Sequence, residues 1–363
     1  MKYTLVLDAF AAAWRGKQQL VLTVSGETVT EVTYRGDTSE PVYRHVSVTH
    51  ALQQMNHQGG LTSFAATLAL CQAIEALCVI TVAPRAAWVR CVYAEIERIL
   101  SHTVAIHDVL DALGIEQLVQ VARAVRQNLG QAMHILQTEG HLASQCLPGG
   151  VRSDVSEQNR QELLTLLPHI DQQLGQMIHR VLDQRLILMR TVDVGTLQRT
   201  AAEGLRRRGP LARASGQTLD MRLDEPYAAY HHLSVQRVVR EDGDVHSRLL
   251  VLLLEAKASV KLMEQALASM PVADWQGMIP TTLPAGLAQG TVEAPRGMLR
   301  CLIESDGERL SEVTLDVPCP FDRLLARTLL VGAWLDNVVL IARSTDPCLP
   351  DAPHLSLIET EAV

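Results

Sequence analysis

The residues best suited to chemistry lie near the end of the chain, in 344–354. In "STDPCLPDAPH", Cys348, Asp351 and His354 follow one another at steps of three residues between prolines. Thiolates and imidazoles at such steps can converge on one metal ion, as in sites that use Cys-x2-Cys with a nearby His. One Cys, one Asp and one His make a weak ligand set, however. A rigid, proline-rich terminus with a buried thiol explains the same residues.

A turn in "EAPRG" offers a second kind of site. Glu293 and Arg296 stand on either side of a proline and before a glycine. This arrangement predicts a turn that presents a guanidinium to a cavity, where a planar and always charged donor can hold an anion or a polar ligand. The alternative is a surface turn with a solvated arginine.

Two groups of residues on predicted helices complete the candidates. In "AEIERILSH", Glu95, Arg98 and His102 share one helix face at three- and four-residue spacing. Ion pairs across a helix surface explain this spacing, and a proton relay is the alternative. His50 and His57 flank "ALQQMN" about two helical turns apart, without an obvious acidic partner, so a structural role is the simpler interpretation.

Composition excludes several classes of protein. The 363 residues carry a net charge of -8, which gives no basic face for nucleic acid. No apolar run reaches the roughly 18 to 20 residues of a membrane span. The start "MKYTLVLDAFAAAWRGK" is a poor signal peptide, so we expect a cytoplasmic protein. Seven cysteines without a CxxC pair argue against a disulfide framework, and we expect most to be buried.

The elements that must position these residues are mostly helical. A hairpin is predicted around "SGE" in 19–36, and the helix that begins at Pro84 is expected to end at Gly114. Other helices are predicted at about 116–144, 156–189, 244–269 and 323–334, and a strand at 298–304. The fold class is therefore α+β and mostly α, with a long-helix bundle core, an N-terminal antiparallel β-sheet and a C-terminal mixed α/β lobe. We divide the chain into a sheet region (1–45), a helical bundle (46–190), an irregular segment (191–245), and a final bundle helix with the C-terminal lobe (246–363).

Six motifs carry a family resemblance by their order along the chain. They are "PRAAWVRCVYAEIERILSH", "LPGGVR", "GPLARASGQTLDMRLDEPYAAY", "GDVHSRLLVLLLEAKASVKLMEQAL", "EAPRG" and "STDPCLPDAPH". Together they resemble the large subunit of membrane-bound [NiFe] hydrogenases and, equally, its relative of the 49-kDa type in respiratory complex I, which contributes to the quinone site there. The resemblance covers 19–354 and implies a [NiFe]-hydrogenase large subunit-like fold. Fold alone does not imply an activity.

The resemblance to hydrogenases implies a Ni-Fe centre held by four cysteines, two in an early "CGxC" and two in a late "DPCxxCxxH". Here the late motif keeps Cys348 and His354, but Asp351 replaces its second cysteine. The early motif falls on "HQGGL", where Gln58 and Leu61 occupy the thiol positions. Soft thiolates are what bind low-valent Ni and Fe. We therefore expect no metal and no Ni-Fe centre in this divergent member.

The resemblance to complex I implies a quinone chamber in the vacated space, with an Asp typical at the position of Asp351. This sequence departs from complex I as well, because "LDAFAAAWRGKQQL" lacks the histidine of the first hairpin and the headgroup tyrosine falls near Gln54. His50 or His57 are the candidates to replace that histidine. Arg296 is expected to lie over the emptied pocket.

The predicted site has two groups of residues. The catalytic candidates are Asp351, Arg296 and His57, and the degenerate cofactor-binding positions are Gln58, Leu61, Cys348 and His354. The resemblance implies a large subunit that lies peripherally on the cytoplasmic side of the inner (cell) membrane, without a cofactor of its own. We expect it to pass electrons from an Fe-S partner subunit to a quinone-like acceptor, or to couple to ion translocation.

The expected partners are an Fe-S small subunit, other hydrophilic complex I-like subunits and integral membrane subunits. Two alternatives stay open. One is a non-redox structural subunit of an ion- or substrate-transporting complex. The other is a [NiFe] hydrogenase or sulfur reductase with unusual metal ligation.

Overall fold

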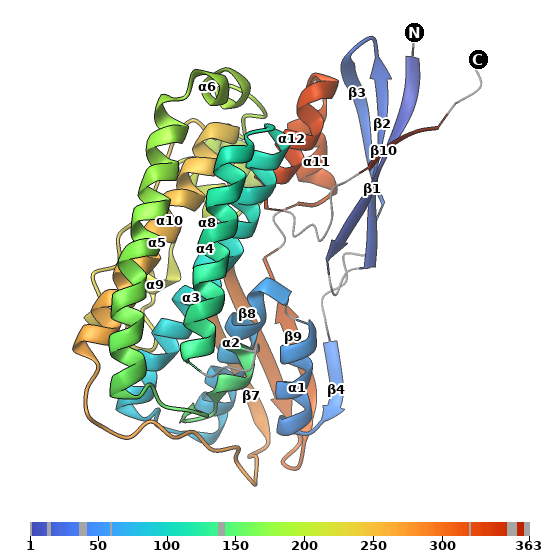
Figure 1. Ribbon diagram of the computed structural model, residues 1–363. Coiled ribbons are helices and arrows are strands. Elements are labelled where there is room, and N and C mark those ends of the chain that lie inside the picture. The colour runs from blue at the N-terminus through green and yellow to red at the C-terminus, as the bar shows by residue number, and fades with distance from the viewer. Residues whose placement is uncertain are drawn as a thin grey trace.

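A bundle of long helices forms one side of the molecule, and two antiparallel sheets lie along the other (Figure 1). The computed structural model describes residues 2–12, 16–35, 42–58, 60–136, 142–318, 321–346 and 354–358. Helices account for most of the regular structure, so the predicted mostly α, α+β fold class is confirmed. The division into four regions stays a prediction, because the elements do not by themselves mark independent units.

Four long helices make the bundle. They are α3 (Pro84–Ala112), α4 (Glu116–Ile135), α5 (Glu157–Asp183) and α10 (Val245–Ser269). The central helix, α3, packs against both α10 and α4, and α5 closes the bundle against the same two helices. Pro84 lies in the first turn of α3, and Gly114 follows the helix with a φ of 69°. Both predicted ends of this helix are confirmed, because proline fits the first turn and glycine fits the left-handed position after the last.

Three of the predicted helices are shorter than the sequence pattern suggests. The helix expected over 323–334 ends at Leu330, because Val331 is extended, with φ -68° and ψ 124°. The described part of α4 ends at Ile135, and the helix expected over 156–189 is interrupted at Gln184. Gln184 is extended, with φ -78° and ψ 111°, and α6 (Arg185–Thr191) begins directly after it. Glutamine is a good helix former, so the sequence holds no sign of this break.

The N-terminal sheet contains strands from both ends of the chain. Its order is β10-β1-β2-β3, formed by β1 (Lys2–Ala12), β2 (Gly16–Ser25), β3 (Thr28–Arg35) and β10 (His354–Ile358). The predicted hairpin is confirmed, since Ser25 pairs with Thr28 and Gly26 takes a φ of 63° in the turn. The sequence did not predict β10, which pairs with β1 in an antiparallel register that places His354 opposite Asp8.

The second sheet carries the turn with Arg296. Its order is β4-β9-β8-β7, formed by β4 (Val42–Val46), β9 (Leu310–Asp316), β8 (Gly297–Ser305) and β7 (Gly286–Ala294). The helix α2 (Ser63–Cys78) packs on β7 and β8, and α1 (Val48–Gln58) packs on α2. A Cβ at Gly290 of β7 would lie 2.0 Å from the carbonyl oxygen of Ala69, so this glycine allows α2 to approach the sheet.

Short elements join these layers. They are η1 (Gly60–Thr62), η2 (Leu142–Gln145), β5 (Cys146–Leu147), β6 (Gly150–Val151), α7 (Arg199–Gly204), α8 (Gly209–Arg213), α9 (Met221–Asp224), η3 (Tyr230–His232), α11 (Arg323–Leu330), η4 (Leu335–Asn337) and α12 (Val338–Ser344). The segment expected to be irregular contains α7, α8, α9 and η3, and α8 and α9 bury the charged side chains of Arg213 and Arg222.

The "LPGG" turn between β5 and β6 is held from the interior by an ion pair. Arg90 Nη2 lies 2.5 Å from Glu75 Oε1 and also donates to the carbonyl of Leu147 at 2.8 Å. The backbone N–H of Gly149 donates to the same carboxylate at 2.8 Å. Both charges are therefore compensated, as a buried pair requires.

Two expectations from composition can be compared with the structure. Four of the five cysteines in the described ranges are buried, as predicted for most of them, and all five are free thiols. None of the helices in the described ranges combines the length and the apolar character that crossing a bilayer requires.

Candidate functional site

Arg296 lies in a tight turn between β7 and β8 and is only 6% exposed. Its Nη2 donates to Asp346 Oδ1 at 2.9 Å, and its Nε donates to the carbonyl oxygen of Asp346 at 3.3 Å. The alternative of a solvated surface arginine is therefore wrong. The guanidinium does point into the interior, but it meets a carboxylate of the chain's own "STDP" segment there.

The position of this turn is fixed by a close approach of two backbones. A Cβ at Gly209, the first residue of α8, would lie 2.3 Å from the carbonyl oxygen of Arg296. Gly209 also has a φ of 69°, and Gly297 has a φ of 124°. A Cβ at Gly297 would lie 2.8 Å from the backbone nitrogen of Gly209, so both glycines are required by conformation and by space.

The early motif lies at the junction of α1 and α2. His57 and Gln58 are the last two residues of α1, and their side chains lie outside the described part of the structure. Leu61 is half-buried in η1, directly before α2. His50, the other candidate histidine, is exposed near the start of α1, with its Nε2 3.1 Å from Gln54 Nε2.

The late motif is described only at its two ends. Asp346, the last described residue before the gap, bonds to Arg296. Cys348 and Asp351 lie outside the described residues, and His354 is described only through the backbone of β10. The roles predicted for these three side chains stay predictions.

Glu97, which the sequence analysis did not select, connects the two motifs. It lies on α3, is 3% exposed, and accepts hydrogen bonds from the N–H groups of Phe64 at 2.6 Å and Ala65 at 3.0 Å. These donors belong to the first turn of α2, where the capping position Thr62 makes no side-chain capping bond. Burial raises the pKa of Glu97 to about 8, although the two N–H groups and the nearby Arg296 act in the opposite direction.

Glu95 and Arg98 form the ion pair predicted from their spacing, at 3.3 Å, but in the interior and not on a helix surface. Glu95 also accepts from Arg222 Nη1 at 3.2 Å and from the hydroxyl of Tyr230 at 2.5 Å. Burial alone would raise the pKa of Glu95, but Arg222 and Arg98 lower it below its ordinary value. Glu95 is therefore an ionised, fully bonded carboxylate.

His102 belongs to a second branch of the same network. Its Nε2 lies 3.1 Å from Glu255 Oε2 on α10, and burial holds the pKa of His102 below its ordinary value. Arg213 of α8 donates to Glu255 at 2.6 Å and to Glu293 Oε1 at 2.8 Å. Arg98 donates to the backbone carbonyl of Glu293 at 2.6 Å, which links the two branches.

We call these side chains the buried charge cluster. Its members are Glu95, Glu97, Arg98, His102, Arg213, Asp220, Arg222, Glu255 and Glu293. With His102 neutral, the cluster has five carboxyl groups and three guanidinium groups, so it would carry a charge of about -2 if all were ionised. Burial raises the pKa of two of the carboxyls, Glu97 and Glu293, and the other three have lowered pKa values. Glu97 and Glu293 are therefore the carboxyls of the cluster that take up protons most readily.

The structure brings together only part of the predicted site. Glu97 links the early and the late motif segments. It accepts hydrogen bonds at the start of α2, near Leu61. The charge of Arg296, which bonds to Asp346, also acts on it. A signal for Glu97 existed in the sequence. In a helix with apolar residues on all sides, such as Ile96 and Ile99, a glutamate on any face is buried.

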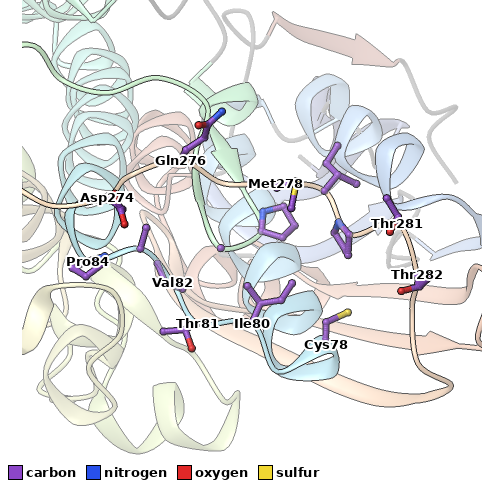
Figure 2. Close-up of a pocket in the computed structure, with 15 residues that line it drawn as sticks. Cys78, Ile80, Thr81, Val82, Pro84, Asp274, Gln276, Met278, Thr281 and Thr282 are labelled. Atoms are coloured by element: carbon purple, nitrogen blue, oxygen red, sulfur yellow. The ribbon is translucent and has the colours of Figure 1, made fainter.

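A cavity of about 680 Å³ lies elsewhere, at the C-terminal end of α2 (Figure 2). It is lined by residues 78–84, by the β5–β6 turn and by the segment 274–282. Its lining includes none of the predicted site residues and no member of the buried charge cluster. We therefore do not assign the predicted chemistry to it.

Comparison with known proteins finds relatives both among complex I subunits and among hydrogenases. The family model for "Respiratory-chain NADH dehydrogenase, 49 Kd subunit" matches residues 114–282. The chain is 27% identical to the "Carbon monoxide-induced hydrogenase" of Rhodospirillum rubrum, over 96% of this chain and 98% of the relative. It is 28% identical to a D-type subunit of the NADH-quinone oxidoreductase of Chloroherpeton thalassium, over 94% of this chain and 84% of the relative. A D-type subunit from Rhizobium meliloti is also 28% identical, over 93% and 91%. The resemblance seen in the six motifs is confirmed.

Proposed function

We propose that this chain is the large subunit of a membrane-bound complex I-like oxidoreductase, because it is a homologue both of the 49-kDa-type subunit of complex I and of the carbon monoxide-induced hydrogenase. In this proposal it receives electrons from an Fe-S small subunit and passes them to a quinone-like acceptor, or couples that transfer to ion translocation. It lies peripherally on the cytoplasmic side of the membrane, with other hydrophilic and integral membrane subunits as partners.

We propose further that the complex works without a Ni-Fe centre in this chain. The positions of the early thiols hold an amide, Gln58, and an isobutyl group, Leu61, and the late pair is reduced to Cys348 beside Asp351. An isobutyl group has no lone pair to offer, and an amide or a carboxylate is too hard a ligand for low-valent Ni and Fe. The residues present therefore do not fit a Ni-Fe centre.

The observation that carries the proposal is the convergence of both motif segments on buried charges. The start of α2 bonds to Glu97, the turn of Arg296 bonds to Asp346, and Arg296 acts on Glu97 through its charge. Burying so many charges adds little stability compared with apolar packing. Buried titratable side chains are useful, however, in a site that couples proton transfer to electron transfer.

The test is quinone reduction by the purified, assembled complex. We expect turnover with a reduced Fe-S donor, and a fall of about tenfold or more for Asp351→Asn if that carboxylate delivers a proton. Asp183→Asn, an exposed substitution at the end of α5, is the matched control and should leave the rate unchanged. Absence of turnover in the wild type contradicts the redox proposal. Turnover that Asp351→Asn leaves unchanged contradicts the role of that carboxylate in proton delivery.

One observation favours a second candidate function, a non-redox structural subunit. Arg296, expected to face a ligand, is paired with Asp346, so this part of the site is already satisfied within the chain. The two candidates differ in what they require of the small subunit. The redox candidate requires an Fe-S cluster there, whereas such a cluster has no use beside a structural subunit that leads to no electron acceptor. Stoichiometric nickel in the purified complex would instead support a hydrogenase or sulfur reductase with unusual ligation.

A further inference from the structure

Glu97 differs from the other buried glutamates in its partners. Five glutamates are buried in the described part of the chain. Four of them, Glu75, Glu95, Glu255 and Glu293, each lie within 4.0 Å of an arginine nitrogen. In the same ranges Glu97 has no ion-pair partner, and it bonds to two backbone N–H groups. A buried carboxylate without a counter-ion in contact is costly, so Glu97 is the glutamate most easily protonated.

Two opposing effects act on this side chain. Burial favours the neutral acid, while the N–H groups of Phe64 and Ala65 and the more distant charges of Arg98 and Arg296 favour the carboxylate. Burial is the larger effect, and it raises the pKa of Glu97 from 4.5 to about 8. A carboxyl with this pKa takes up and releases a proton near neutral pH at a low free-energy cost.

The charges that act on Glu97 come from three packed elements. Arg98 is its neighbour on α3, and Arg296 in the β7–β8 turn acts on it through its charge, while Asp346, which follows α12, is paired to Arg296. The start of α2 contributes two N–H dipoles and the positive end of its helix dipole. The two arginines oppose protonation, and Asp346 weakens the effect of Arg296.

We propose that Glu97 is the proton-binding residue of this site and that release of its proton opens the start of α2. The step is a simple ionisation, in which the carboxylic acid gives H⁺ to water and becomes a carboxylate, and no electron is transferred. Burial costs the carboxylate more than its two N–H partners and the more distant arginines return. The carboxylate therefore favours any conformation in which α2 begins later and the side chain is solvated.

Linkage gives the sign and the size of the effect. The closed state binds the proton with the raised pKa of about 8, and an open, solvated state binds it with the ordinary value of 4.5. The closed state is therefore favoured at low pH, and the open population rises about tenfold per pH unit between these two values. Above the higher value no further change is expected, because both states are then ionised.

The start of α2 follows η1, and η1 contains Leu61, one of the predicted pocket positions. Opening at Phe64 and Ala65 would therefore move the wall of that pocket. This consequence rests on the proposed function. The titration of Glu97 and the opening of α2 do not.

The test is amide hydrogen exchange of the full chain across this pH range, followed by mass spectrometry of the peptides that cover residues 60–68. Dividing each rate by that of the same unfolded peptide gives the opening constant. We expect the opening constant of the wild type to rise about tenfold per pH unit and to level off near the raised pKa. Glu97→Gln, which cannot ionise, should show no such rise. Glu116→Gln, an exposed first-turn glutamate of α4, is the matched control and should follow the wild type.

An opening constant at 60–68 that does not change with pH in the wild type would overturn the proposal. So would a rise of equal size in Glu97→Gln. If that variant fails to fold, infrared spectroscopy of the wild type decides: the band of a buried protonated carboxyl must disappear near the raised pKa, and its absence at neutral pH contradicts the proposal. Neither readout needs an electron acceptor, so failure of the proposed function would leave this inference standing.

Discussion

Arg213 joins Glu255 and Glu293 in the core, so replacing it with methionine leaves two buried carboxyls without their shared cation. Burial opposes ionisation of Glu255, but Arg213 and His102 lower its pKa from 4.5 to about 2. This difference corresponds to about 3 kcal/mol of stability at neutral pH. Breaking a buried ion pair from one side costs about 3–5 kcal/mol. We therefore expect Arg213→Met to lower the free energy of unfolding by about 3–5 kcal/mol.

Urea unfolding of the full chain measures this loss, and the pH dependence tests its cause. Because the folded pKa of Glu255 is lowered, its contribution in the wild type is present above pH 4.5 and is lost as the pH falls through about 2. In Arg213→Met the unpaired carboxyls take up protons more readily, so the loss should shrink as the pH is lowered from 8 to 5. Adding Glu255→Gln should recover part of the stability, about 1–2 kcal/mol.

Arg123→Met is the matched control for this prediction. Arg123 pairs with Glu116 at 3.7 Å, and both side chains are about half-exposed or more. Its removal should cost less than about 1 kcal/mol at any pH. An equal, pH-independent loss in Arg213→Met and Arg123→Met would refute the argument that the buried charge cluster depends on Arg213. Strict additivity of Arg213→Met and Glu255→Gln would do the same.

Two further predictions concern the turn of Arg296. Asp346→Asn removes the charge that offsets Arg296, so the infrared titration of Glu97 should move to lower pH; a shift to higher pH, or none, contradicts the electrostatic link between them. Gly209→Ala places a Cβ 2.3 Å from the carbonyl oxygen of Arg296 at a φ of 69°, and should lower the free energy of unfolding by about 1–3 kcal/mol in urea. The control is Gly204→Ala, at a helical position with open space, which should change stability little.

Local signals in the sequence predicted much of the fold. The β2–β3 turn, the start of α3 at Pro84 and its end before Gly114 all depend on residues within a few positions of each other. The strands β7 and β10 were missed for different reasons. β7 runs unbroken through Gly290 and forms a hairpin with β8, but a glycine weakens the strand pattern in the sequence, and here it allows α2 to approach. β10 pairs with a strand from the other end of the chain.

The candidate site was less predictable for a similar reason. The spacing of Glu95 and Arg98 predicted their ion pair, but helical spacing cannot say whether a pair is on the surface or buried. Arg296 was selected as a functional residue, yet its partner Asp346 is 50 residues away. The apolar character of α3 could have predicted that Glu97 is buried, but not which groups it contacts, because any residue except proline can supply the backbone N–H groups to which it bonds.

Electron transfer through this subunit is the central claim, and one measurement tests it most directly. In the assembled complex, the Fe-S cluster of the partner subunit is reduced, quinone is added in a rapid mixer, and the cluster is followed by electron paramagnetic resonance. The proposal predicts that the signal of the reduced cluster disappears as quinone is consumed, without nickel in stoichiometric amount. A cluster that stays reduced in the presence of excess quinone would contradict it.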